Sequence, residues 1–281
     1  TGAKVGFLSE SANSVGAQLV GAQPQQGGLN AGQMLAGKGL KAVVLMGVEP
    51  EFDAANPSAA MAAVQGAEMV VALSSFKTAA SDYADVILPI APFSETSGTF
   101  VNAEGRAQSF HGVVKPLGDT RPAWKVLRVL GTMLGLEGFA YETSEEVKAR
   151  ALGDLAALPA KLNNATSAAI NLSASTGGLE RLADVPIYAA DALVRRAESL
   201  QATADAKAPV ASLPQALWAE LGLAAGAQVK VSQDGANGAV SAVLPAVLDA
   251  SLPANVVRVP AGTSATATLG ASFGTVRVEK A

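Results

Sequence analysis

Three short apolar runs, separated by segments typical of helices, constrain the fold of this chain more than any other feature. The runs are Ala42–Met46, residues 69–73 and Val86–Pro89, each of a length typical of a strand. Pro57–Gln65 is predicted to be a helix, because proline suits a first helical turn and the next residue, a glycine, can end it. Short crossovers between such strands favour a right-handed parallel arrangement. We therefore predict an α/β fold with a doubly wound, mostly parallel sheet, in which Ala42–Met46 is a buried strand.

Weaker local signals predict the other elements of the first half. They are a possible strand at 4–8, a short helix at 30–36, a polar glycine-punctuated surface loop at 91–118, an amphipathic helix at 122–135, and a second helix capped by Thr143 or Ser144.

The last seventy residues follow a different pattern, with several β segments and no long helix between them. A short helix at 212–221, ended by Gly222, precedes predicted strands at 228–232, 239–244, 255–259 and 275–279. This pattern favours a small closed β-barrel. The stretches 165–178 and 201–211 carry little bulk and are typical of linkers. We predict an α/β domain at 1–160, a connecting segment at 161–211 and a β-barrel at 212–281.

Composition excludes several classes of protein. The 281 residues contain no cysteine, which excludes disulfides, thiol nucleophiles and thiolate-held iron–sulfur clusters within this sequence. The net charge is −4 and the basic residues are scattered, so we expect no nucleic acid partner. No apolar run approaches the ~18 residues of a membrane span, so we expect no membrane insertion. Because the sequence starts at Thr1 without a leader, we expect a piece of a longer protein.

Familiar catalytic and metal-binding patterns are not supported. Residues 32–39 have the glycine and lysine spacing of a phosphate loop, but Gly39 stands where Ser or Thr should hold magnesium, so a surface turn is the better interpretation. His111 is the single histidine, which leaves no two-histidine metal site. Nothing in the spacing of Glu95 and Glu104 forces their carboxylates together. We therefore assign no catalytic and no metal-ligating residue.

The carboxyl ends of the predicted strands are the places where α/β proteins bind ligands. Amides near Gly47, the hydroxyls of Ser74, Ser75 and Thr78, and the Lys77 cation could bind an anionic, nucleotide-like group there. The alternative, which the physics alone favours, is that these groups only cap helices.

Several short motifs, in a fixed order between residues 42 and 130, resemble the molybdopterin oxidoreductase family. They are Gly47-Val48-Glu49-Pro50, Phe76-Lys77-Thr78, the runs at 82–89 and 95–106, and Arg121-Pro122-Ala123-Trp124-Lys125. Within the family this stretch is most similar to the large G-type subunit of bacterial NADH-quinone oxidoreductase, respiratory complex I. Residues 213–259 resemble the family's molybdopterin-dinucleotide-binding barrel, which implies a double-psi-like barrel.

The resemblance implies where a pterin cofactor would lie. In family members that hold the cofactor, the segments matching 47–50, the loop near Lys77 and 102–106 lie beside the pterin or its nucleotide. The ancestral pterin-site positions in this chain are Gly47, Glu49, Pro50, Lys77, Thr78, Asn102, Glu104, Gly105 and Arg106.

The likeness to complex I implies a structural part without a cofactor of its own. Iron–sulfur clusters would belong to a cysteine-bearing N-terminal part, and the partners would be other peripheral-arm subunits. That complex transfers electrons from NADH to quinone, at the cytoplasmic side of a bacterial inner membrane. One alternative is the molybdopterin-binding domain of an active molybdenum or tungsten oxidoreductase, in which Lys77 and Arg106 neutralise phosphate and Asn102 bonds the pterin. Another is a nucleotide-binding module unrelated to respiration.

Overall fold

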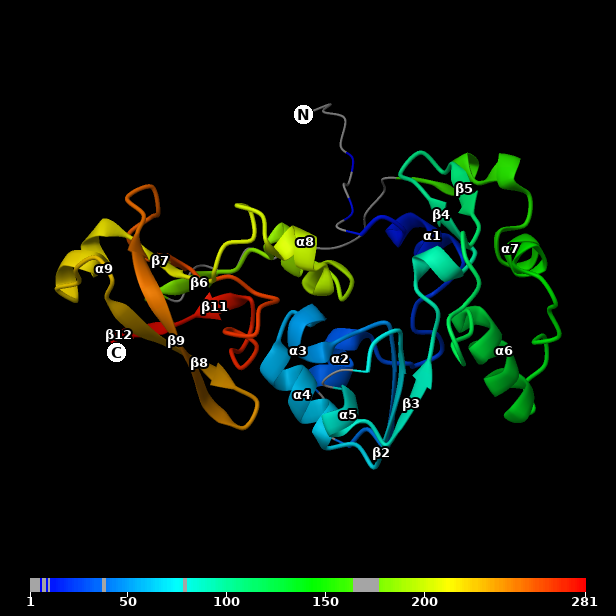
Figure 1. The fold of residues 1–281 in the computed structure, drawn as a ribbon, viewed down its shortest axis with the longest axis horizontal. Helices are drawn as coiled ribbons and strands as arrows, with labels where there is room; N and C mark the ends of the chain where they lie inside the picture. Colours follow the sequence, from blue (N-terminus) through cyan, green and yellow to red (C-terminus); the bar gives the residue numbers. More distant parts are fainter. Residues whose placement is uncertain (1–5, 7–8, 10, 37–38, 78–79, 164–176) are drawn as a thin grey trace. The chain divides into compact units, whose positions relative to one another are not determined.

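The computed structural model describes residues 6, 9, 11–36, 39–77, 80–163 and 177–281 (Figure 1). The chain divides into two compact units, each made of several stretches of sequence. Unit 1 comprises Thr1–Asn30, Leu73–Lys77 and Ile87–Leu172, and unit 2 comprises Ala31–Ala72, Thr78–Val86 and Ser173–Ala281. The predicted strand at 4–8, except Gly6, and the predicted linker at 165–178, except its last two residues, lie outside the described residues.

The three apolar runs form the predicted parallel sheet, in the order β1-β2-β3. These strands are β1 (Ala42–Met46), β2 (Met69–Ser74) and β3 (Val86–Pro89). The helix α4 (Pro57–Gln65) also forms as predicted, and the Ala59 N–H donates to the Asn56 side chain at 3.0 Å to cap it. The shorter helices are α2 (Ala31–Ala36) and α5 (Ala80–Tyr83).

The prediction that Ala42–Met46 is a buried strand is wrong. Val44 is 55% exposed and Met46 is 48% exposed. β1 is an edge strand of the sheet, and every second side chain along it faces away from the part that is covered. A continuous apolar run predicts a strand correctly here but does not fix which of its faces is buried.

Unit 1 contains a hairpin that the sequence analysis missed. The predicted surface loop at 91–118 includes β4 (Gly98–Val101) and β5 (Ala107–Phe110), which pair antiparallel. Three helices complete the unit: α1 (Ser14–Leu19), α6 (Ala123–Met133) and α7 (Ser144–Leu152). Short 3₁₀ turns lie at Phe93–Glu95, Leu155–Ala157 and Pro159–Lys161. Val101, Leu152 and Leu158 form the small core.

The helix caps of unit 1 agree with the sequence. The Glu146 N–H donates to Thr143 Oγ1 at 3.2 Å, so Thr143 is the cap of α7, as one of the two predicted candidates. In return the Glu142 N–H donates to the Glu146 carboxylate at 2.8 Å, which satisfies a second free amide.

Unit 2 contains a curled, seven-stranded sheet in the order β11-β6-β10-β7-β9-β8-β12. Its longest strands form the hairpin of β8 (Gln228–Gly235) and β9 (Gly238–Leu248), drawn in orange in Figure 1. The other strands are β6 (Glu180–Leu182), β7 (Ala211–Leu213), β10 (Val256–Arg258), β11 (Phe273–Thr275) and β12 (Arg277–Lys280). Its apolar core includes Leu213, Val229, Val231, Leu244, Val257 and Leu269, all at most 1% exposed.

The sheet has two edge strands, β11 and β12, so it is a half-barrel and the predicted closed barrel is not observed. The double-psi topology stays a prediction. The predicted strand at 275–279 is two strands, because the chain passes from one sheet edge to the other at the buried Val276. The helix predicted at 212–221 begins later, as α9 (Gln215–Glu220), because residues 211–213 form a fully buried strand.

The predicted connecting segment at 161–211 contributes structure to unit 2. Besides β6, it contains α8 (Glu198–Gln201) and the 3₁₀ turns Ile187–Ala189 and Val194–Arg196. Arg181 of β6 is 3% exposed, and its guanidinium donates to the carbonyls of Val259 and Pro260 and to the Gln233 side chain. In the part of the chain that the structure describes, no helix is long and apolar enough to cross a membrane.

Candidate functional site

The loop after β1 carries the first group of predicted cofactor positions. Gly47 has a φ of +63°, a conformation that favours glycine, and nothing lies within 4 Å of the place where a Cβ would stand. Pro50 then opens the short helix α3 (Pro50–Asp53). Gly47, Glu49 and Pro50 are therefore close together at the carboxyl end of a parallel strand, where α/β proteins bind ligands.

The buried Glu49 is the centre of a partly exposed cluster of charges, which we call the carboxylate–arginine cluster: Glu49, Asp53, Arg195 and Arg196. The Glu49 carboxylate is 2.8 Å from Arg195 Nη2 and 2.5 Å from Arg196 Nη2. Arg195 also contacts Asp53 at 2.9 Å, and the Glu49 N–H donates to Asp53 at 2.7 Å. Burial raises the pKa of Glu49, but hydrogen bonds from Arg196 and Arg195 outweigh it and hold that pKa below its ordinary value. The carboxylate of Glu49, which is a predicted cofactor position, is therefore already bound by two arginines of the chain.

Glu51 is a second buried acid beside this cluster, and it is only 8% exposed. Neither of its carboxylate oxygens has a hydrogen bond of good geometry, although the Tyr83 hydroxyl is close enough to interact with it. Burial raises the pKa of Glu51, with smaller contributions from the charges of Glu49 and Asp53. Burial and then the charge of Glu51 also raise the pKa of Tyr83. The sequence analysis missed Glu51, because an acid in a first helical turn is usually a surface residue.

The loop after β2 carries the predicted anion-binding hydroxyls and lysine. The Ser74 hydroxyl donates to the Phe76 carbonyl at 2.9 Å and accepts from the Phe76 N–H at 3.1 Å. Ser74 therefore shapes its own turn, which is neither of the two predicted uses of its hydroxyl. Lys77 is exposed, and Thr78 lies outside the described residues.

The turn between β4 and β5 holds the last group of predicted positions. The Asn102 side-chain oxygen accepts from the N–H groups of Glu104 and Arg106 at 3.0 and 2.9 Å, so Asn102 fixes the turn. Gly105 has a φ of +79°, and a Cβ there would lie 3.0 Å from the Pro159 backbone. The Glu104 and Arg106 side chains are exposed. Asn102, Glu104, Gly105 and Arg106 thus lie together in unit 1.

The predicted positions fall in both units. Lys77 and the 102–106 turn belong to unit 1, whereas Gly47, Glu49 and Pro50 belong to unit 2.

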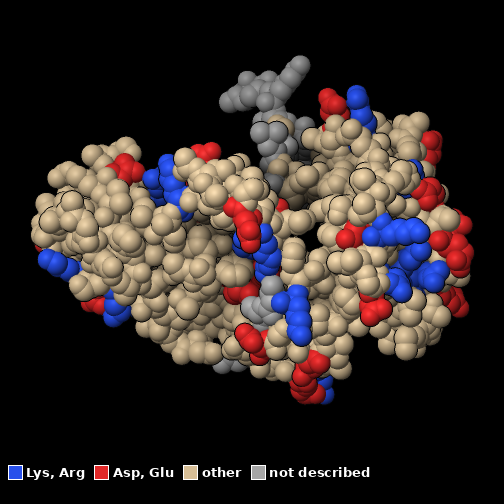
Figure 2. All heavy atoms as spheres, in the orientation of Figure 1, with Lys and Arg blue, Asp and Glu red and all other residues tan. Residues whose placement is uncertain are grey.

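His111 is exposed and lies 3.8 Å from Glu145, and the Glu95 carboxylate accepts from the Leu117 N–H at 3.0 Å. The described residues include no group of three His, Cys, Asp or Glu side chains placed to hold a metal. On the face shown in Figure 2, Lys and Arg are interspersed with Asp and Glu, and neutral residues cover most of the surface.

Comparison with known proteins decides the family of the N-terminal half. Residues 1–133 match the family model described as molybdopterin oxidoreductase. This part of the chain is a molybdopterin oxidoreductase domain. The family expected from the motifs is therefore confirmed for the molybdopterin oxidoreductase domain, and the narrower likeness to complex I stays a prediction.

Curated relatives of this chain include two Staphylococcus aureus proteins, each named "Putative formate dehydrogenase". The protein of strain USA300 is 37% identical over 82 residues, which is 29% of this chain and 8% of the relative. The protein of the bovine strain RF122 is 32% identical over 98 residues, which is 35% of this chain and 10% of the relative. The matched stretch thus spans about a tenth of these relatives.

Among solved structures, the acetylene hydratase of Pelobacter acetylenicus is similar in fold. The TM-score is 0.55 and the sequence identity is 17%, and the match covers 79% of this chain and 37% of that chain. At this identity the likeness shows the fold alone.

Proposed function

We propose that this chain is a molybdopterin-binding part of an active molybdenum or tungsten oxidoreductase, of the class that its relatives' names give as formate dehydrogenase. The observation that carries the proposal is the match of residues 1–133 to the molybdopterin oxidoreductase family. The similarity to proteins named as formate dehydrogenases supports the same class of reaction.

The residues at the predicted positions are compatible with a pterin that carries anionic phosphate. The open space beside Gly47 gives a ligand access to the backbone at the end of β1. Lys77 and Arg106 are exposed cations, which suit phosphate. The two arginines on Glu49 neutralise its charge, so that carboxylate would not repel an anion strongly. When bound, the metal–pterin group would supply the redox chemistry. Lys77 and Arg106 of unit 1 would hold its phosphate.

The second candidate is a structural part of the large peripheral-arm subunit of complex I, without a pterin. Two residues predicted to bind the cofactor are instead bound within the protein, and this favours the second candidate. Glu49 is bound by arginines, and the Asn102 oxygen fixes its own turn. In this candidate the partners are neighbouring peripheral-arm subunits, and the place is the cytoplasmic face of a bacterial membrane.

Cofactor content separates the two candidates. The 281-residue chain is produced in a bacterium that makes molybdopterin, and the purified protein is analysed for molybdenum and tungsten and, after oxidation, for fluorescent pterin. Near-stoichiometric metal and pterin support the first candidate, and a protein without either contradicts it and favours the second. In the first case, the double variant Lys77→Ala, Arg106→Ala should lose most of the pterin. The control variant Lys161→Ala, at another exposed lysine of unit 1, should keep it.

A further inference from the structure

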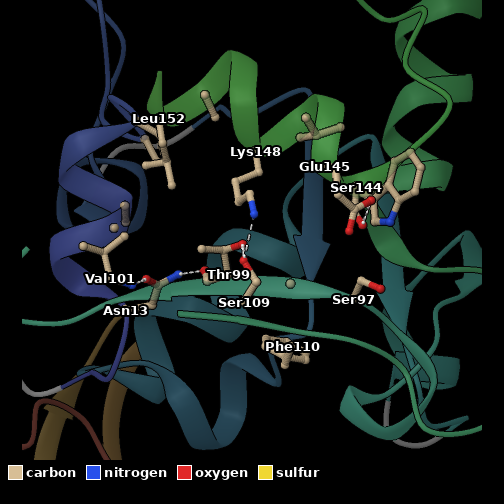
Figure 3. Close-up of a pocket in the computed structure, with 18 residues that line it drawn as sticks. Asn13, Ser97, Thr99, Val101, Ser109, Phe110, Ser144, Glu145, Lys148 and Leu152 are labelled. Carbon is tan, nitrogen blue, oxygen red and sulfur yellow. Dashed lines mark hydrogen bonds between the residues drawn. The ribbon is translucent and has the colours of Figure 1, made fainter. Parts of the chain in front are cut away.

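Unit 1 contains a pocket of about 380 Å³ that includes none of the predicted cofactor positions. We call it the hairpin pocket. Its walls come from α1, the β4–β5 hairpin and α7 (Figure 3). Trp124, at the start of α6, also lines it. This volume is in the range of small-molecule sites.

The walls of the hairpin pocket are mostly aliphatic. α1 contributes Ala17 and neighbouring residues, and α7 contributes Val147, Ala151 and Leu152. These side chains cannot pair with a polar ligand. An occupant therefore needs a hydrocarbon body to gain free energy by burial.

The floor of the pocket is polar because of the strand register. Thr99 pairs directly with Ser109, so both side chains lie on one face of the hairpin, and their hydroxyl oxygens are 3.0 Å apart. The adjacent positions face the other side, where Phe100 and Phe110 stack at 5.6 Å between ring centroids and Phe93 packs against both. The aromatic cluster supports the hairpin from behind, and the two hydroxyls remain on the pocket side.

Lys148 is the cation of the pocket. It is half-buried, it points from α7 toward the floor, and its Nζ donates to Ser109 Oγ at 3.2 Å (Figure 3). Throughout the described ranges, no carboxylate lies within 4.0 Å of this ammonium group. An ammonium group has three N–H donors, so Lys148 can bind an anion and keep its bond to Ser109.

Glu145 limits how much negative charge the pocket accepts. It lies one turn before Lys148, its side chain is 57% exposed, and it is 3.8 Å from His111. Its own backbone N–H and the Ser144 hydroxyl lower its pKa, so it stays ionised. One cation beside one rim carboxylate suits a singly charged anion better than a phosphate.

The shape of the pocket is fixed before a ligand arrives. The Val101 N–H donates to Asn13 Oδ1 at 2.9 Å, and Asn13 Nδ2 donates to the Thr99 carbonyl at 3.2 Å, which ties α1 to β4. The buried Gly16 leaves room for this side chain, because a Cβ there would lie 2.2 Å from Asn13 Oδ1. A preorganised pocket spends less free energy on ordering when it binds.

We propose that the hairpin pocket binds a small monocarboxylate with a hydrocarbon body. The carboxylate accepts from Lys148 Nζ and from a hydroxyl of the Thr99–Ser109 pair, and the hydrocarbon lies against α1, α7 and Trp124. This site is separate from the proposed pterin positions and does not depend on them.

Calorimetric titration of the 281-residue chain with hexanoate, and with hexanamide as the neutral analogue of the same shape, tests the proposal. Hexanoate is expected to bind at least about tenfold more tightly than hexanamide, because a hydrogen bond to a charged group is worth more than a neutral one. Equal affinity, or no binding of hexanoate up to about 10 mM, would overturn the proposal.

Variants locate the site. Lys148→Met should weaken hexanoate about tenfold and leave hexanamide unchanged, and Lys148→Arg should restore most of the loss. Lys161→Met removes the same charge from an exposed position of unit 1 and should change neither affinity. In a Trp218→Phe background, hexanoate should change the fluorescence of Trp124. A loss common to both Met variants, or an unchanged Trp124 signal, would place the binding elsewhere and refute the site.

Discussion

Replacing Arg181 by methionine should destabilise unit 2 by about 3 kcal/mol. The guanidinium makes three hydrogen bonds of 3.2 Å or less, to the Val259 and Pro260 carbonyls and the Gln233 side chain. Hydrogen bonds to a charged group contribute about 2 kcal/mol each, so the three together stabilise by about 6 kcal/mol. Burial opposes them, because it lowers the pKa of Arg181 from 12.5 to about 10, which offsets about 3 kcal/mol. Methionine keeps the apolar stem but leaves three buried acceptors without a donor.

Urea unfolding, followed by the fluorescence of Trp218 in a Trp124→Phe background, measures this loss, since Trp218 packs against the core of the curled sheet. The matched control is Arg277→Met. Arg277 is 71% exposed and pairs with an exposed Asp234, so its loss should cost less than about 1 kcal/mol. If Arg181→Met is as stable as the wild type, or if both variants lose equally, the argument that the carbonyl contacts hold the sheet together is refuted.

Three further substitutions have directions that the structure fixes. Glu49→Gln should destabilise the chain by about 2–3 kcal/mol at pH 7. Because the folded pKa of Glu49 lies below its ordinary 4.5, this difference should disappear as the pH falls through 4.5 and then through the folded value, in unfolding curves taken at several pH values. Glu51→Gln should instead stabilise at pH 7 by about 1 kcal/mol, since burial raises that pKa, and its advantage should vanish below pH 4.5; a destabilised variant would contradict the assigned burial. Gly131→Ala should lower the melting temperature, although alanine favours helices by about 1 kcal/mol, because its Cβ would lie 2.3 Å from the Phe139 ring. A raised melting temperature would show that this contact relaxes freely.

Elements with local signals were predicted closely. The helix α4 has a proline at its first position and a glycine at its end. The cap of α7 is Thr143, whose hydroxyl accepts a hydrogen bond from the amide three residues later. β6 and β7 are different, because each is three residues long and is defined by distant partners. β6 pairs with residues 256–258 and β7 with residues 246–248. A three-residue strand has no periodicity to detect, so only the pairing reveals it.

The candidate site shows the same division between local and distant information. The glycine turn at Gly47 and the turn at 102–106 follow from residues adjacent in sequence, and both are present. The partners of Glu49 are 146 and 147 residues away, and nothing in their spacing indicates an ion pair. The hairpin pocket likewise depends on the register of two strands, which the sequence analysis did not resolve.

The two edge strands of the curled sheet follow one another directly in the sequence. β11 and β12 are separated by Val276 alone, whose N–H donates to the Leu179 carbonyl. One uninterrupted stretch of polypeptide therefore occupies both outer hydrogen-bonding positions. Loss of β12 from the sheet would uncover backbone amides of β8, and loss of β11 would uncover those of β6. Residues 273–280 thus cover the margins at β6 and β8 against pairing with another molecule.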